Sequence, residues 1–183
     1  MQITLSSNLV ESSRALWLTC LLITIAILFG ACVGGSGALG RQYQSDTLFL
    51  LPLDLETVPH VYFQDDDGIN KVILPSTGNE LLVLHTQIGN HAAGSTTLDM
   101  EVEPAEIRTD DGTGYYSLNT LQAAKASSAS YTDKNKFVPF LRGRQEVLRD
   151  YHLDGWLVFE VPIDSTLSLL RWEISGDVIR IDL

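Results

Sequence analysis

The sequence predicts an all-β protein in which antiparallel strands form a sandwich or barrel, preceded by one N-terminal hydrophobic helix. Three observations predict this class. One long uncharged run lies near the N-terminus, short segments of alternating apolar and polar residues follow it, and glycine-containing turns separate those segments. The segments do not alternate regularly with helices, which argues against a parallel sheet.

The N-terminal run extends from Ala15 to Gly40 without a charged residue. Its dense part, 15–33, is about 19 residues long, which suffices to cross a bilayer. Gly30 and Ala31 precede Cys32, and this segment resembles the lipobox of bacterial lipoproteins, in which the cysteine is lipidated. Three alternatives stay open: a lipoprotein signal that ends at Cys32, an uncleaved membrane anchor, and an ordinary cleaved secretion signal.

These observations divide the chain into three parts. Residues 1–32 are a lipoprotein signal or membrane anchor, residues 33–44 are a Gly/Ser-rich tether, and residues 45–183 are an extracytoplasmic β-sandwich domain. Every alternative for the N-terminus exports the domain. We therefore expect the protein at the cell membrane, lipid-anchored or single-pass, with its domain facing outside the cytoplasm.

The charge and the cysteine content limit the partners of the domain. With 23 acidic and 12 basic residues the formal net charge is -11, which disfavours nucleic acid as a partner. Anionic lipids repel an acidic domain, so membrane contact is expected through the anchor alone. Cys20 and Cys32 both precede the domain, which therefore contains no disulfide and depends on its hydrophobic core.

Five segments alternate apolar and polar residues with a period of two. Each is predicted to be an antiparallel strand with one buried face and one face in water: 81–88, 96–102, 157–161, 170–174 and 179–183. Phe159 and Trp172 fall on the apolar phase and are expected in the core, whereas Glu160 is expected in solvent. Segment 121–130 is rich in Ala and Ser and is predicted to be a loop or insert with room for one or two helical turns.

Three segments resemble parts of one known family. Its opening unit resembles Gly78-Asn79-Glu80-Leu81-Leu82-Val83-Leu84 followed by Gln87-Ile88-Gly89-Asn90. Its central hairpin resembles Asp111-Gly112 with Tyr115-Tyr116. Its closing strand pair resembles Gly155-Trp156-Leu157-Val158-Phe159-Glu160-Val161-Pro162 followed by Leu170-Arg171-Trp172. The family is called domain of unknown function 4352. The resemblance covers residues 78–183. It implies an immunoglobulin-like antiparallel β-sandwich of bacterial surface lipoproteins, and it implies no catalytic residues.

Known catalytic and cofactor motifs are absent from the sequence. There is no Gly-x-Ser-x-Gly, no His-Glu-x-x-His, no P-loop and no Cys-x-x-Cys. The histidines are scattered along the chain, at His60, His85, His91 and His152, and each is expected to be an ordinary surface or partly buried residue. We therefore predict that the protein is not an enzyme, with no catalytic residues and no cofactor.

Asp65, Asp67 and Asn70 form a weak calcium candidate. The EF-hand spacing fails at both of its ends when Gly68 is set at the glycine position of that loop. A looser calcium site built from these three residues is one interpretation, and an acidic hairpin in water is the other. No other metal site is expected.

Tyr115 and Tyr116 are the candidate ligand contacts. They lie beside a predicted hairpin turn, and a strand presents one of two neighbouring side chains outward. Trp156 and Trp172 could also form a ligand platform, but they are expected to fill the core of the sandwich.

The sequence thus predicts a membrane-anchored binding or structural module at the bacterial cell envelope. Its expected partners are the membrane, through the N-terminal anchor, and an envelope protein. Two alternatives stay open: an extracytoplasmic enzyme with a site that no motif reveals, and an accessory subunit of an envelope complex. A histidine held against a carboxylate would favour the enzyme, and a large exposed apolar patch would favour the subunit.

Overall fold

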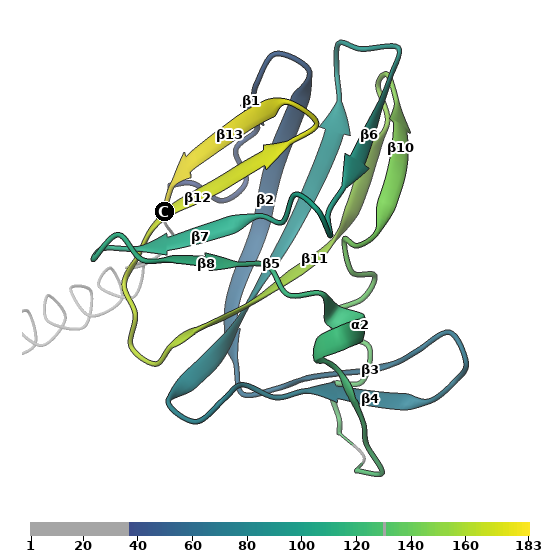
Figure 1. Ribbon diagram of the computed structural model, residues 1–183, viewed down its shortest axis with the longest axis vertical. Helices are drawn as coiled ribbons and strands as arrows, with labels where there is room; N and C mark the ends of the chain where they lie inside the picture. Colours follow the sequence, from purple (N-terminus) through teal and green to yellow (C-terminus); the bar gives the residue numbers. More distant parts are fainter. Residues whose placement is uncertain (1–36, 130) are drawn as a thin grey trace, which may run out of the picture. The chain divides into compact units, whose positions relative to one another are not determined.

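The computed structural model describes residues 37–129 and 131–183. The predicted signal or anchor, Cys32 and residues 33–36 lie outside the described residues. Within these ranges nearly all regular structure is β-strand, every named strand pair is antiparallel, and the one helix, α2, has four residues (Figure 1). No helix in the described ranges is long and apolar enough to cross a membrane.

Two four-stranded sheets form the sandwich (Figure 1). The first sheet has the order β1-β2-β5-β11, and the second has the order β13-β12-β7-β8. Their strands are β1 (Tyr43–Gln44), β2 (Leu48–Val58), β5 (Asn79–Asn90), β11 (His152–Pro162), β13 (Asp177–Asp182), β12 (Leu167–Ile174), β7 (Glu106–Thr109) and β8 (Gly114–Tyr116). A separate antiparallel pair consists of β6 (Ser95–Asp99) and β10 (Arg144–Leu148).

Alternate residues of both sheets build the core between them, as the period of two predicts. The core includes Leu82, Leu84, Ile88, Leu157, Phe159, Leu170, Trp172, Ile174, Ile179 and Ile181. Phe159 and Trp172 are fully buried, and the indole Nε1 of Trp172 donates a 2.8 Å hydrogen bond to the carbonyl oxygen of Glu103. The predicted antiparallel β-sandwich and the core positions of these two residues are confirmed.

The other face of the first sheet is also covered by apolar residues. A second core consists of Val61, Phe63, Ile73, Leu81, Val83, Phe137, Trp156 and Val158. It is formed with β3 (Val61–Gln64), β4 (Asn70–Ile73), β9 (Lys125–Ala126), α2 (Thr120–Ala123) and residues 131–141, which together we call the outer layer. The prediction that β5 has one face in water is therefore wrong for its first half, because apolar layers cover both of its faces.

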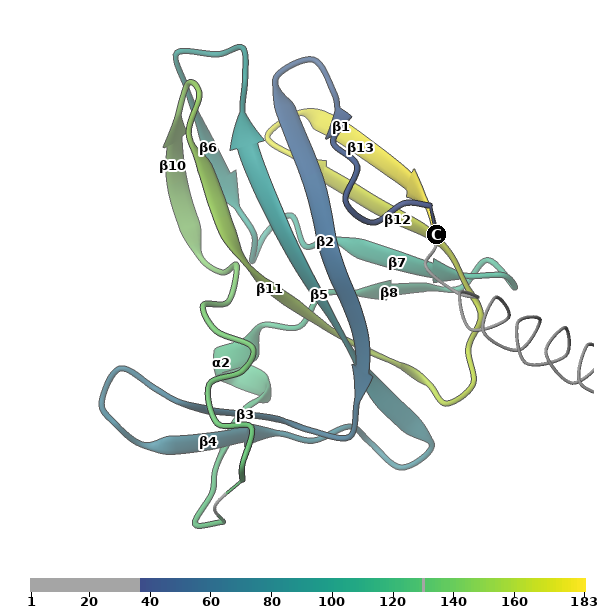
Figure 2. The same ribbon diagram turned by 180° about the vertical axis from the view of Figure 1, so that it is seen from behind.

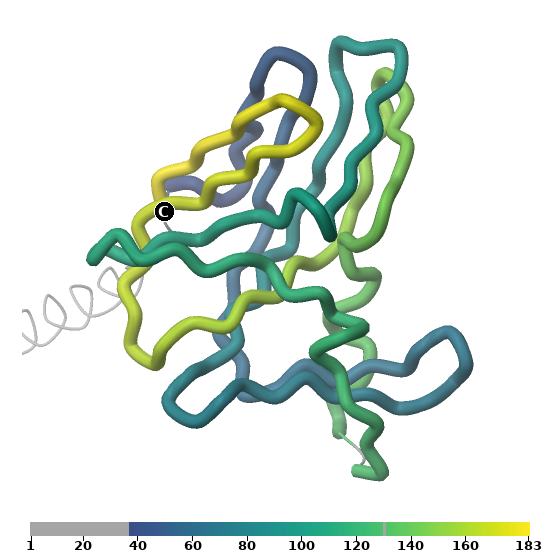
Figure 3. The backbone as a smooth tube through the Cα atoms, in the orientation of Figure 1, coloured from purple at the N-terminus to yellow at the C-terminus, as the bar shows by residue number. Residues whose placement is uncertain are grey.

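Two stretches of the chain build the outer layer: the β3–β4 hairpin lies between β2 and β5 in the sequence, and α2, β9 and residues 131–141 lie between β8 and β10. β2 and β5 pair directly, and the chain makes the β3–β4 hairpin between them (Figure 3). In Figure 2 this hairpin and α2 lie at the lower end of the long strands. The predicted insert at 121–130 falls here, and α2 is a single turn whose N-cap, Asn119, accepts a 3.2 Å hydrogen bond from the backbone of Gln122.

The folded domain begins before residue 45. Ala38 is buried in the sandwich core, the backbone N–H of Gly40 donates a 2.7 Å hydrogen bond to the carbonyl oxygen of Pro52, and Tyr43–Gln44 form β1. Residues 37–44, which the sequence assigned to the tether, belong to the domain because they find both apolar and hydrogen-bonding partners there.

Candidate functional site

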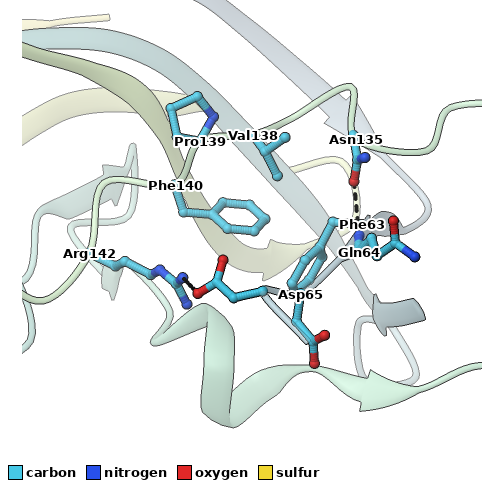
Figure 4. Close-up of a pocket in the computed structure, with 9 residues that line it drawn as sticks. Phe63, Gln64, Asp65, Asn135, Val138, Pro139, Phe140 and Arg142 are labelled. Carbon is cyan, nitrogen blue, oxygen red and sulfur yellow. Dashed lines mark hydrogen bonds and ion pairs between the residues drawn. The ribbon is translucent and has the colours of Figure 1, made fainter. Parts of the chain in front are cut away.

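A pocket of about 380 Å³ lies between β3, the turn that follows it, and the segment 135–142 (Figure 4). We call it the outer pocket. Two stretches far apart in the sequence line it: Phe63, Gln64, Asp65, Asp66, Asn135, Val138, Pro139, Phe140 and Arg142. Small-molecule sites in proteins have volumes of roughly 300–1,000 Å³, so this pocket is large enough for a small ligand.

Hydrogen bonds hold the segment 135–142 between two strands. The N–H of Gln64 on β3 donates to Oδ1 of Asn135 at 2.8 Å. On the other side the N–H of Trp156 donates to the carbonyl oxygen of Pro139, and the N–H of Leu141 donates to that of Trp156, both at 2.9 Å. The segment is thus hydrogen-bonded to β3 at one end and to β11 at the other.

Aromatic side chains form the base of the outer pocket. Phe63 is only 3% exposed, and its ring meets that of Phe140 edge to face, with 4.9 Å between the centroids (Figure 4). Phe137 packs in the same manner against Trp156, at 5.0 Å. Edge-to-face pairs are a favourable aromatic geometry, so the base is a rigid apolar surface continuous with the second core.

The rim of the outer pocket is charged. Nη2 of Arg142 lies 3.4 Å from Oδ2 of Asp66, whose side chain is 95% exposed. Asp65 is committed to the fold, because its Oδ1 accepts hydrogen bonds from the backbone of Asp67 at 3.1 Å and of Ile69 at 2.7 Å. Its Oδ2 lies 3.5 Å from Nζ of Lys71. Arg142 and Asp66 are therefore the ionised groups of the rim that a ligand can engage.

Two residues of the calcium candidate, Asp65 and Asn70, have different surroundings in the structure. The Asp65 carboxylate closes the turn and pairs with Lys71, while Oδ1 of Asn70 is buried without a hydrogen-bond partner in the described part of the chain. Within that part, His, Cys, Asp and Glu side chains form no group of three that could hold a metal ion. Calcium binding by Asp65, Asp67 and Asn70 stays a prediction.

Tyr115 and Tyr116 lie on β8, at the edge of the second sheet, whereas the outer pocket lies against the first. Tyr115 is partly buried against the sandwich core, and Tyr116 is 60% exposed. One of the two neighbours therefore faces solvent, as expected, and a ligand contact there stays a prediction. The lipidation of Cys32 also stays a prediction.

Two histidines are held against carboxylates. Nε2 of His60 lies 3.2 Å from Oδ2 of Asp133, and His85 lies against Asp154 on the outer face of the first sheet. Nε2 of His85 lies 2.9 Å from Oδ1 of Asp154, and Nε2 of Gln87 donates to Oδ2 at 2.8 Å. The hydrogen bond with His85 contributes most, and the hydrogen bond from Gln87 contributes next, to holding the pKa of the Asp154 carboxyl below its usual range. The His85 ring also stacks on Trp156, with 4.6 Å between centroids, so the pair is held in one orientation.

Of the residues that line the outer pocket, Asp65 was predicted from the sequence as a site residue, whereas Phe63, Val138, Phe140 and Arg142 were not. The available signal was the short apolar run Phe137-Val138-Pro139-Phe140-Leu141, which follows no strand or helix period. An apolar run in a loop indicates that the loop lies against another surface. The sequence does not show which surface that is, because Phe63 lies in a distant part of the chain.

The fold and the outer pocket define a class: an all-β protein of two packed antiparallel sheets, with an added apolar layer that contains a pocket. No family model matches the chain, and no curated protein matches it. The resemblance to domain of unknown function 4352, and with it the immunoglobulin-like class, stays a prediction.

Three solved structures are similar to this chain. An uncharacterized β-sandwich protein from Clostridium difficile 630 has 14% identity and a TM-score of 0.44, over 78% of this chain and 89% of that one. The secreted protein MPT63 from Mycobacterium tuberculosis has 14% identity and a TM-score of 0.46, over 84% of this chain and 100% of that one. A conserved hypothetical protein from Bacillus anthracis has 10% identity and a TM-score of 0.49, over 80% of this chain and 94% of that one.

Proposed function

We propose that this protein is an extracytoplasmic binding module at the bacterial cell envelope, held at the membrane by its N-terminal segment, with the outer pocket as its ligand site. The observation that supports this most is the second core. A sandwich sheet can leave its outer face in water. Here that face is instead covered by an apolar layer that leaves an aromatic pocket open.

Membrane attachment rests on the sequence before the described residues. The run 15–33 is long enough to cross a bilayer, and Cys32 follows the small residues of a lipobox-like segment. The domain is already folded at Ala38, so only a short piece of chain separates it from Cys32.

Fractionation of the full chain in a bacterial host tests this proposal. The wild type should stay in membranes washed with alkaline carbonate and should incorporate a palmitate analogue. Cys32→Ser should abolish the label and leave an unprocessed precursor, whereas the control Cys20→Ser should keep it. Membrane retention without label would favour an uncleaved anchor. Wild-type protein released by the wash would contradict membrane attachment.

The pair His85–Asp154 favours a second candidate, an extracytoplasmic enzyme. An oriented imidazole could activate a nucleophile, but the described hydrogen bonds join His85 to no hydroxyl or thiol. We therefore propose binding as the function and a structural role for the pair. Turnover of a small ester that is lost in His85→Gln and kept in His152→Gln would favour the enzyme instead.

A further inference from the structure

Arg142 occupies an unusual position in this acidic protein. Besides the outer pocket it lines two smaller hollows, one beside Met100 and Pro104 and the other beside Leu153 and Asp154. Arg142 thus borders three hollows, in a chain whose acidic residues outnumber its basic residues by 23 to 12.

The ion pair of Arg142 with Asp66 is open to exchange. Its 3.4 Å separation is longer than the roughly 2.7–2.9 Å of a strong charge-assisted hydrogen bond. Asp66 is 95% exposed, so water can replace Arg142 as its partner at little cost. The described residues give the guanidinium no second carboxylate. By contrast, Nε of Arg108 lies 2.9 Å from Glu106, a buried carboxylate that fixes it in place.

Apolar groups border the same space. Figure 4 shows the Phe140 ring beside Arg142, with Val138 and Phe63 farther along the pocket. The pocket therefore combines an aromatic base with one guanidinium whose present partner is displaceable. A cationic ligand would be repelled by Arg142, and a neutral ligand would form no ion pair with it. A ligand with an apolar body and a carboxylate satisfies both parts.

We propose that the outer pocket binds an apolar or aromatic carboxylate, and this proposal rests on the binding function proposed above. The apolar body lies against Phe63, Val138 and Phe140, and the carboxylate replaces Asp66 on Arg142. Arg suits this exchange because its planar fork can donate two parallel hydrogen bonds to one carboxylate. A free organic acid and the C-terminus of a peptide share this chemistry.

Isothermal titration of the purified full chain in a non-ionic detergent tests the proposal, with titration into detergent alone as the reference. N-acetyl-phenylalanine should bind at least about tenfold more tightly than its amide, since a hydrogen bond to a charged group is worth about that factor. N-acetylglycine, which has the carboxylate without the apolar body, should bind far more weakly. Equal binding of acid and amide would overturn the proposal.

Substitutions assign the effect to the two charged residues. Arg142→Gln should remove the preference for the acid over the amide, and Asp66→Asn should tighten acid binding because the competing carboxylate is gone. Arg144→Gln is the matched control: it changes the charge equally at an exposed position on β10, and it should alter nothing. A preference that survives Arg142→Gln would overturn the proposal, and unchanged melting of each variant shows that it folds.

Two further ligands distinguish the sources of the carboxylate. Tighter binding of a tetrapeptide that ends in Phe than of N-acetyl-phenylalanine indicates a peptide C-terminus, and tighter binding of decanoate indicates a free acid. Either result supports the proposal. If the amide binds as well as the acid, the pocket is still a binding site and only the carboxylate chemistry fails. If no ligand of the series binds, the carboxylate proposal fails, while membrane attachment is decided separately by fractionation.

Discussion

Asp177, the first residue of β13, accepts a hydrogen bond from the hydroxyl of Ser45, with 2.6 Å between Oδ2 and Oγ. The same oxygen accepts hydrogen bonds from the backbone N–H groups of Thr47 at 2.8 Å and Leu48 at 2.7 Å. One carboxylate thereby joins the last strand of the second sheet to the β1–β2 turn of the first sheet. It closes one side of the sandwich.

We expect this carboxylate to make stability depend on pH. Burial alone raises the pKa of Asp177, but its hydrogen bonds from Ser45, Thr47 and Leu48 outweigh burial and hold the pKa below its usual range. Such a group stabilises the fold above its unfolded pKa of about 3.9. The stabilisation is lost as the pH falls through the folded-state pKa. Asp177→Asn should therefore lower the free energy of unfolding at pH 7 by about 1–3 kcal/mol.

Urea unfolding of wild type and variant at several pH values measures this effect. The difference between the two should be full at pH 7. It should shrink as the pH falls below about 4, where the carboxylate of the unfolded chain takes up a proton, and it should be lost as the pH passes through the lower pKa of the folded state. Asp46→Asn, at an exposed position in the same turn, should differ little from wild type at any pH. An Asp177→Asn difference that is equal at pH 3 and pH 7 would contradict this account.

Phe159 and Glu160 are neighbours on β11 with different roles. Phe159→Ala should cost about 3–5 kcal/mol, because the ring is fully buried between the sheets. Glu160 was expected in solvent, but its Oε1 accepts hydrogen bonds from Ser76 N at 2.9 Å and Asn79 Nδ2 at 2.7 Å. Glu160→Ala should therefore cost about 1 kcal/mol. Thermal melting checks both values. A loss of unfolding free energy that is larger in Glu160→Ala than in Phe159→Ala would contradict the assigned faces.

Gly155 lies where β11 meets the segment that lines the outer pocket. A Cβ there would lie 2.7 Å from the carbonyl oxygen of Pro139 and 3.2 Å from Cγ of Leu141. Gly155→Ala should therefore push the segment away from β11 and weaken ligand binding in the outer pocket. Gly94→Ala, where a Cβ meets nothing within 4 Å, should leave binding unchanged. Titration with N-acetyl-phenylalanine compares the two, and equal affinities would show that this contact does not position the pocket.

The sequence contains enough local information to predict the sandwich. Leu170, Trp172 and Ile174 alternate with the charged residues Arg171 and Glu173, and this period of two assigns the inward face of a strand without any long-range contact. The end of β13 follows the same rule, since Ile179 and Ile181 are buried and Arg180 is exposed.

The outer layer could not be predicted in this way. Leu81-Leu82-Val83-Leu84 is apolar at both phases, a pattern typical of a strand buried on both faces, but the pattern does not identify what covers the second face. The pocket depends on contacts between Phe63 and Phe140, which only the folded chain brings together. Tyr115 and Tyr116 could be predicted as contacts because they lie beside a predicted hairpin turn, where a strand presents one of two neighbouring side chains outward.

Hydrogen–deuterium exchange of the full chain, with and without N-acetyl-phenylalanine, tests most directly whether the outer layer forms the ligand site. Ligand should slow exchange in residues 64–66 and 140–142, which line the outer pocket, and leave residues 114–117 around Tyr116 unchanged. Slower exchange confined to 114–117, or no change in either region at saturating ligand, would contradict the proposal that the outer pocket binds ligands.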